Sequence, residues 1–135
     1  MKTRIYLLLL TVASLACHKS VEPTTQATII AVDTVAVNQE QLRITDTTRT
    51  LTRWSIKLKD VTIKDQGDYN YSVVVAYNLP ENGAFVKNAS IRFNYVVVPK
   101  EKRKELSTPY EILNMRAGAL PYKPELALSN VEVIK

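Results

Sequence analysis

Cysteine, histidine and glycine are scarce in this chain of 135 residues, which has one cysteine, one histidine and three glycines. A single cysteine excludes an intrachain disulfide, the usual crosslink of a small exported domain. Too few cysteine and histidine residues are present to supply the ligands of a zinc site or the base of a catalytic triad. Three widely spaced glycines do not make a phosphate-binding loop. The sequence therefore predicts no metal, no cofactor and no enzymatic activity of these classes.

The excess of positive charge is too small to indicate a nucleic-acid partner. Lys2 and Arg4 belong to the N-terminal leader described below, and without them 16 basic residues remain against 13 acidic ones. Proteins that bind nucleic acid concentrate lysine and arginine on one face, beside aromatic residues or a known motif. The chain is long enough for one domain, and its hydrophobic share of 46% is typical of a folded protein.

The first 16 residues have the three-part order of a secretory signal peptide. Lys2 and Arg4 come first, an apolar run covers residues 5–12, and small residues precede Cys17. Spanning a bilayer takes about 20 apolar residues, and polar residues follow the cysteine before that length is reached. Residues 1–16 are therefore predicted to be a cleaved signal peptide and not a membrane-spanning helix.

Residues 13–17, Ala-Ser-Leu-Ala-Cys, resemble the lipobox of bacterial lipoproteins, whose cysteine becomes the lipid-modified N-terminus. The family prefers an aliphatic residue and then a small one at the places where this chain has serine and then leucine. The alternative is an ordinary signal peptidase that cuts after Ala16 and leaves Cys17 as a free thiol. The resemblance implies a lipid on Cys17, and His18 after it implies sorting to the outer membrane, with the face of that membrane left open.

The rest of the chain divides into a tether and a β-domain. Residues 17–26 contain the cysteine and a polar stretch typical of a flexible tether. From residue 27 to residue 135, runs of β-branched and aromatic residues alternate with turn formers, and almost no segment has the helical period. The strands are predicted at residues 27–37, 42–44, 54–59, 69–77, 89–97, 110–115 and 126–134. Seven or so short strands predict an all-β domain, a β-sandwich.

Alternation predicts which side chains are buried in this domain. Trp54, Ile56 and Leu58 alternate with polar residues, which gives that strand one apolar face and one wet face. The same alternation predicts core positions for Tyr69, Tyr71, Tyr77 and Tyr95. The turn signature at residues 80–83, Pro-Glu-Asn-Gly, indicates that the strands on either side of it are adjacent.

Residues 56–78 resemble the E and F strand region of immunoglobulin-like domains and, in their last part, the matching strand of fibronectin type III domains. The shared pattern is alternating apolar residues followed by Asp65, Gly67 and Tyr69 at every second position. In that family the tyrosine forms a tyrosine corner, whose hydroxyl bonds to upstream backbone. The resemblance implies this role for Tyr69 and an immunoglobulin-like sandwich. Because too few residues precede the motif and too many follow it, the strand order is predicted to be non-classical.

Two kinds of side chain are candidates for contact with a partner or ligand. Tyr110 and Tyr122 lie near prolines in late loops, where exposed rings are suited to binding sugar. The second candidate is a basic run that is suited to anionic headgroups or an acidic partner, although such runs are often only solvated. Its members are Lys100, Lys102, Arg103 and Lys104.

Carboxylates are the remaining candidates for chemistry. Asp65 with Asp68, or Asp46 with Asp60, would suit a glycosidase or a calcium site if the members of a pair met in space. Turn capping and solvated charge are the interpretation that we prefer for them.

The sequence thus predicts a non-enzymatic, lipid-anchored protein of the bacterial outer membrane that contacts an envelope protein, as an accessory subunit. A small carbohydrate-binding surface lipoprotein is the alternative.

Overall fold

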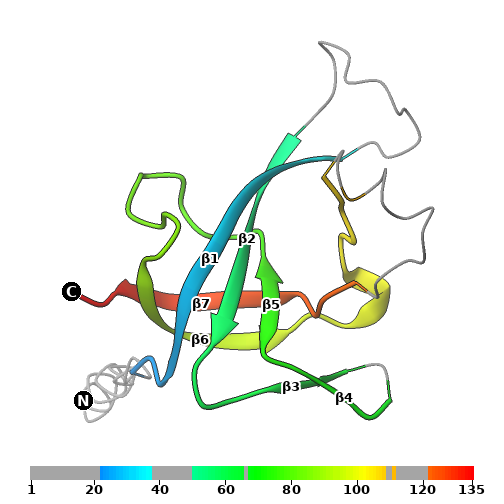
Figure 1. The fold of residues 1–135 in the computed structure, drawn as a ribbon, viewed down its shortest axis with the longest axis horizontal. Helices are drawn as coiled ribbons and strands as arrows, with labels where there is room; N and C mark the ends of the chain where they lie inside the picture. Colours follow the sequence, from blue (N-terminus) through cyan, green and yellow to red (C-terminus); the bar gives the residue numbers. More distant parts are fainter. Residues whose placement is uncertain (1–21, 38–49, 66, 109–110, 112–121) are drawn as a thin grey trace, which may run out of the picture.

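The computed structural model describes residues 22–37, 50–65, 67–108, 111 and 122–135 (Figure 1). The described residues contain seven strands and one 3-10 helix. In chain order these are β1 (Thr25–Ala36), β2 (Thr50–Leu58), β3 (Ile63–Asp65), β4 (Tyr69–Tyr71), β5 (Val73–Ala76), β6 (Ser90–Val97), η1 (Lys100–Lys102) and β7 (Leu126–Val133). The all-β prediction is confirmed, with seven strands in two antiparallel sheets and a non-classical strand order.

The larger sheet has five strands in the order β5-β2-β1-β6-β7, and β3 and β4 form a separate pair. The central strand, β1, pairs with β2 along most of its length and with β6 only near its start. A bulge between Ile29 and Ala31 interrupts the register of β1 on β2, and bulges bend and twist a strand. The two parts of the sheet therefore take different directions, and Figure 1 shows β6 and β7 running across β2 and β5.

Curvature brings the two edge strands of this sheet together. The backbone N–H of Val75 in β5 donates to the carbonyl of Pro124 at 2.9 Å, and a parallel bridge joins Val75 to Glu125. Asn78 adds two hydrogen bonds to Leu128 in β7: its amide nitrogen donates to the carbonyl at 2.7 Å, and its amide oxygen accepts from the N–H at 3.1 Å. The sheet is thus a partly closed barrel, and its two halves form the facing layers of a sandwich.

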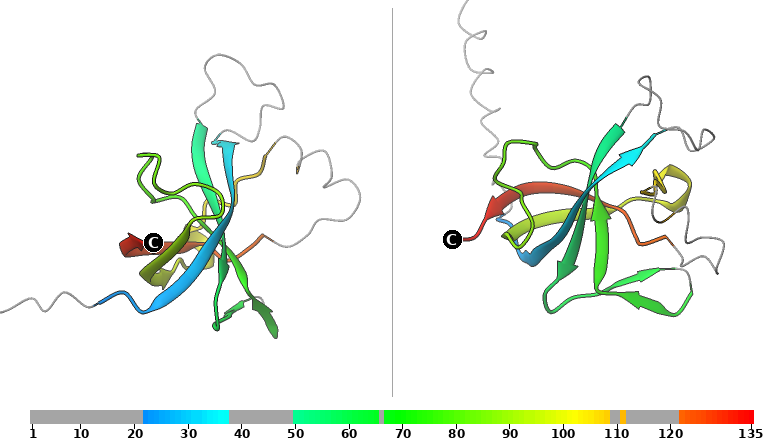
Figure 2. Two further views of the ribbon diagram at one scale, coloured as in Figure 1. Left: turned by 60° about the vertical axis from the view of Figure 1, so that its left-hand side comes forward. Right: turned by 45° about the horizontal axis from the view of Figure 1, so that its top comes forward.

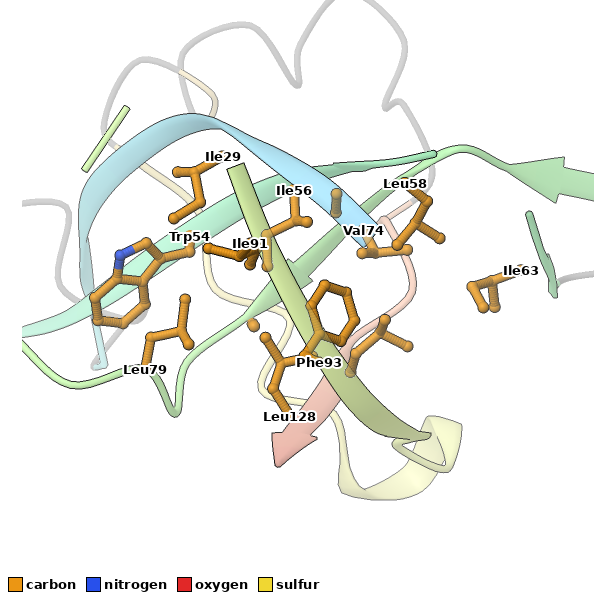
Figure 3. Packing of buried hydrophobic residues seen from close by; sticks show 13 residues of the cluster. Ile29, Trp54, Ile56, Leu58, Ile63, Val74, Leu79, Ile91, Phe93 and Leu128 are labelled. Atoms are coloured by element: carbon orange, nitrogen blue, oxygen red, sulfur yellow. The ribbon is translucent and has the colours of Figure 1, made fainter. Parts of the chain in front are cut away.

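The hydrophobic core lies between these layers (Figure 3). Its largest fully buried side chains include Phe93, Ile29, Ile56 and Ile91. Trp54 is also buried, and its indole N–H donates to the carbonyl of Phe85 at 2.9 Å, so the polar atom of the ring has a partner. The core positions predicted for β2 from alternation are confirmed.

The adjacency predicted around the Pro-Glu-Asn-Gly turn is wrong. Residues 69–77 contain two short strands, β4 and β5, and β5 pairs with β2. The next strand, β6, pairs with β1 and β7 instead. The turn lies in a longer connection whose Leu79 is buried in the core and whose Phe85 packs against it. The strands that it joins are not neighbours, because β2 and β1 lie between β5 and β6 in the sheet.

Other predicted strands have different outcomes. The strand predicted at 126–134 is found as β7, and that at 27–37 as β1. The segment 42–44 lies outside the described residues, and of the segment 110–115 only Glu111 is described. The leader, Cys17 and the first part of the tether are also outside the described residues.

Candidate interaction surface and its ion pairs

The basic run after β6 is divided between solvent and the interior of the domain. Lys100 and Lys102 belong to η1 and are exposed. The side chain of Arg103 is 5% exposed, and its guanidinium donates to both carboxylate oxygens of Asp65, at 2.6 and 3.2 Å. Its Nε donates to the carbonyl of Val98 at 2.9 Å. The hydrogen bond with Asp65 is the main cause that raises the pKa of Arg103 above its ordinary value, so the guanidinium stays charged.

Lys104, the last member of the run, also contacts the domain. Its ammonium group forms an ion pair with Glu125 at 3.0 Å and lies 5.1 Å from the centre of the Tyr77 ring. Its backbone N–H donates to the other carboxylate oxygen of Glu125 at 2.7 Å. Lys104 and Arg103 therefore join segments of the fold, whereas the two lysines of η1 face solvent.

The Asp65–Arg103 pair fixes a small hairpin to the barrel. In this hairpin β3 and β4 pair Asp65 with Tyr69, and Ile63 with Tyr71. Gly67 lies in the turn with φ of +83°, a conformation that favours glycine. Ile63 is buried, and the hydroxyl of Tyr71 is buried with no hydrogen-bond partner among the described residues. One face of the hairpin is thus packed inward.

Tyr69 does not have the surroundings that the immunoglobulin resemblance implies. Its side chain is 70% exposed at the end of the hairpin, whereas a corner tyrosine packs where two sheets cross. Asp65 and Gly67 do flank the turn, but this turn connects β3 and β4 and not the two layers of the domain. The tyrosine-corner role of Tyr69, and its predicted place in the core, are corrected accordingly. Tyr71 and Tyr77 are half-buried.

The carboxylates considered for hydrolysis have different surroundings. Asp65 is held by Arg103, whereas Asp68 is fully exposed and has Lys64 at 3.5 Å. Asp46 lies outside the described residues. In the part of the chain that the structure describes, no group of three or more histidine, cysteine or acidic side chains could hold a metal ion.

A second charged network lies on the face of β2 that alternation predicts to be wet. Arg53 and Ser55 are both buried there, so β2 is covered on two sides. The guanidinium of Arg53 donates to both carboxylate oxygens of Glu111, at 3.0 and 3.1 Å. It also donates to Asp33 of β1 at 3.1 Å and to the carbonyl of Leu106 at 3.0 Å. The chain after η1 is therefore fastened over the outside of β1 and β2.

Thr108 and Glu111 form a capping box within this network. The backbone N–H of Thr108 donates to the Glu111 carboxylate at 2.7 Å, and the N–H of Glu111 donates to the Thr108 hydroxyl oxygen at 3.2 Å. Our sequence reasoning missed Arg53 and Glu111. The spacing Thr-x-x-Glu is a signal that marks Glu111, but Arg53 has no local signal because its partners are distant in sequence.

The pKa of Glu111 is set by opposing effects. Burial has the largest effect and would by itself raise the pKa, because it disfavours the charged carboxylate. Hydrogen bonds from Arg53 and from Thr108 together outweigh burial, and the pKa of Glu111 lies below its ordinary value. The carboxylate is therefore ionised at neutral pH and stabilises the folded state there.

Acid should remove this stabilisation. Because the pKa of Glu111 is lower in the folded state, its contribution is complete above the unfolded-state pKa of about 4.3 and declines as the pH falls through the folded-state value. We expect wild type to be more stable than Glu111→Gln at pH 7, and the difference to shrink below about pH 4. Urea unfolding of both proteins at several pH values measures this difference. A difference that does not change with pH would contradict the assigned role.

Only one of the two candidate tyrosines is among the described residues. Tyr110 lies outside the described residues, and Tyr122 is half-buried shortly before β7. Among the described residues, no helix is long and apolar enough to cross a bilayer. Comparison of the chain with family models, with curated proteins and with solved structures found no match.

Proposed function

We propose that this protein is a non-enzymatic lipoprotein of the bacterial outer membrane, anchored through Cys17, whose β-domain contacts another envelope protein. The ion pairs support the non-enzymatic part of this proposal. Arg53, Arg103 and Lys104 each join two segments of the domain through carboxylates. Ion pairs that hold a fold together also shift pKa values, so the shifts of Arg53, Arg103 and Glu111 are accounted for without a catalytic role.

The contact role is proposed because the second half of β1 has one edge that pairs with no described strand. Residues 31–36 pair with β2 on one edge. The pairing of β1 with β6 ends at Thr28, and two further backbone hydrogen bonds join Ile29 to residues 88 and 89. Among the described residues, no strand pairs with the other edge of residues 32–36. An open edge can accept an extended segment of a partner, which adds a strand through main-chain hydrogen bonds.

Side chains at this edge are suited to contact with a protein. Val32 is 41% exposed, and Thr34 is exposed two residues further along. Asp33 and Val35 point to the opposite side of the strand, where Asp33 bonds Arg53 and Val35 is fully buried. One face of this part of β1 is therefore covered by the domain, and the other face exposes the β-branched side chains of Val32 and Thr34.

Crosslinking from intact membranes tests both parts of the proposal. A photoreactive residue at position 34 should capture one stoichiometric envelope protein, whereas the same residue at position 127, exposed on β7, should not. In parallel, the protein should incorporate radioactive palmitate, and Cys17→Ser should abolish both the label and the sedimentation with membranes.

Three results would count against the proposal. Unchanged palmitate labelling of Cys17→Ser would exclude Cys17 as the anchor. Equal capture from positions 34 and 127, or no capture from either, would exclude the open edge of β1 as the contact. Binding to a glycan array that Tyr122→Ala or Tyr110→Ala abolishes would favour the carbohydrate-binding alternative.

A further inference from the structure

The length of the tether determines which end of the domain faces the lipid. Glu22, the first described residue, follows Cys17 by five residues. Five fully extended residues span at most about 18 Å. With a lipid on Cys17, as proposed above, Glu22 therefore lies within about 18 Å of the bilayer surface, and the elements beside the start of β1 lie near the headgroups.

The β3–β4 hairpin lies at this end of the domain. Ala27 near the start of β1 pairs with Leu58 at the end of β2, and the N–H of Lys59 donates to the carbonyl of Gln26 at 2.9 Å. The hairpin begins four residues after Lys59, at Ile63. Figure 1 and the left view of Figure 2 show the start of β1 and the hairpin both on the lower side of the domain, with the hairpin extending away from β1, and the start of β2 on the upper side.

The surface of the hairpin region has the composition of a membrane interface. Tyr69 is 70% exposed and Val61 is 40% exposed. Lys59 and Lys64 are exposed too. Tyrosine and lysine side chains are both suited to the headgroup layer, because each has an apolar part and a polar end. Asp60 and Asp68 are exposed too, so apolar contact and not net charge provides the attraction. The tether supplies the high local concentration that such a weak contact needs.

The hairpin is held in a fixed orientation before any contact with lipid. Its Asp65 receives the bidentate hydrogen bonds of Arg103, and the carboxylate is 15% exposed. The ion pair neutralises the carboxylate of Asp65, which pairs with Tyr69 across the hairpin. Ile63 is buried, which adds an apolar attachment. A preorganised hairpin loses little conformational entropy when it settles on a surface.

We propose that the β3–β4 hairpin rests on the bilayer that holds Cys17, with Tyr69 and Val61 in the headgroup layer. This inference rests on the lipid anchor of the proposed function. The start of β2 then lies at the end of the domain that faces away from the membrane. Residues 31–36 of β1, which pair with β2 on one edge, extend in that direction, and their other, open edge is accessible to a partner.

The single cysteine of the chain makes this orientation measurable. Because a lipid occupies Cys17, a cysteine introduced elsewhere is the only free thiol of the lipidated full-length protein. Tyr69→Cys reports on the hairpin, and Thr50→Cys, exposed at the start of β2, is the matched control. Each variant is labelled with a polarity-sensitive fluorophore and placed in vesicles of phosphatidylethanolamine and phosphatidylglycerol that carry a quencher at headgroup depth.

The label at position 69 should show a blue-shifted emission and several-fold stronger quenching than the label at position 50. Equal, water-like signals at both positions in a palmitate-labelled protein would overturn the orientation and leave the anchor intact. Absence of palmitate from both variants would overturn the anchor and the orientation together. Stronger quenching at position 50 would show that the domain has the opposite orientation.

Discussion

Replacement of Phe93 by alanine should lower the free energy of unfolding by about 3–5 kcal/mol, because it leaves a large cavity in the core. Phe93 is fully buried, and its ring meets that of Tyr95 edge to face with centroids 6.2 Å apart. A domain of this size is stable by only about 5–15 kcal/mol. Urea unfolding followed by far-UV circular dichroism measures the loss.

Val96→Ala is the matched control for this substitution. Val96 lies on the same strand, but 69% of it is exposed. An exposed position of this kind should change stability by no more than about 0.5 kcal/mol. Similar losses for the two variants would mean that the assigned core is wrong.

Loss of Arg103 should have the second-largest effect. Arg103→Ala leaves the carboxylate of Asp65 covered and without its guanidinium partner, which should cost about 3 kcal/mol. Arg103→Lys keeps the charge but not the planar pair of hydrogen bonds, so its loss should be smaller. Chemical unfolding measures both variants, and Lys102→Ala, exposed in the adjacent helix η1, serves as the control.

A double-mutant cycle separates the ion pair from the rest of the side chain. Asp65→Asn combined with Arg103→Ala should cost clearly less than the sum of the two single substitutions, because the single changes each leave a charge without its partner. Additive losses, or equal effects of Arg103→Ala and Lys102→Ala, would contradict the role of the pair in attaching the hairpin. Because the hairpin is the proposed membrane contact, Arg103→Ala should also weaken the quenching of a label at position 69.

The chain between β6 and β7 takes part in three of the six ion pairs found among the described residues. Arg53, Arg103 and Lys104 each involve the chain between β6 and β7, which lies across the outside of the barrel. Hydrophobic burial holds the barrel itself, and ion pairs, hydrogen bonds and the buried side chain of Leu106 attach the covering segment. Of the carboxylates in these pairs, Glu111 has a lowered pKa, so its bonds to Arg53 are lost only as the pH falls through that value.

Several features of the protein follow from the sequence alone because they depend on neighbours in the chain. Alternation of side chains has a period of two in any strand, so the buried positions of Trp54, Ile56 and Leu58 could be predicted without knowing their partners. The same reasoning found β1 and β7. The leader and the lipobox-like residues before Cys17 are likewise read locally, and their prediction of an anchor depends on no contact within the domain.

Tertiary structure alone decided that the side chain of Arg103 is buried and that Tyr69 is exposed. Arg103 lies within a run of basic residues that looks solvated, and its partner Asp65 is 38 residues away. Tyr69 belongs to an apolar alternation, yet it is exposed because its short strand leaves the barrel. Asn78 closes the barrel on Leu128, 50 residues further along. Side-chain alternation is a local property, whereas these contacts depend on which strands become neighbours, and the bend of β1 and the long connections determine that.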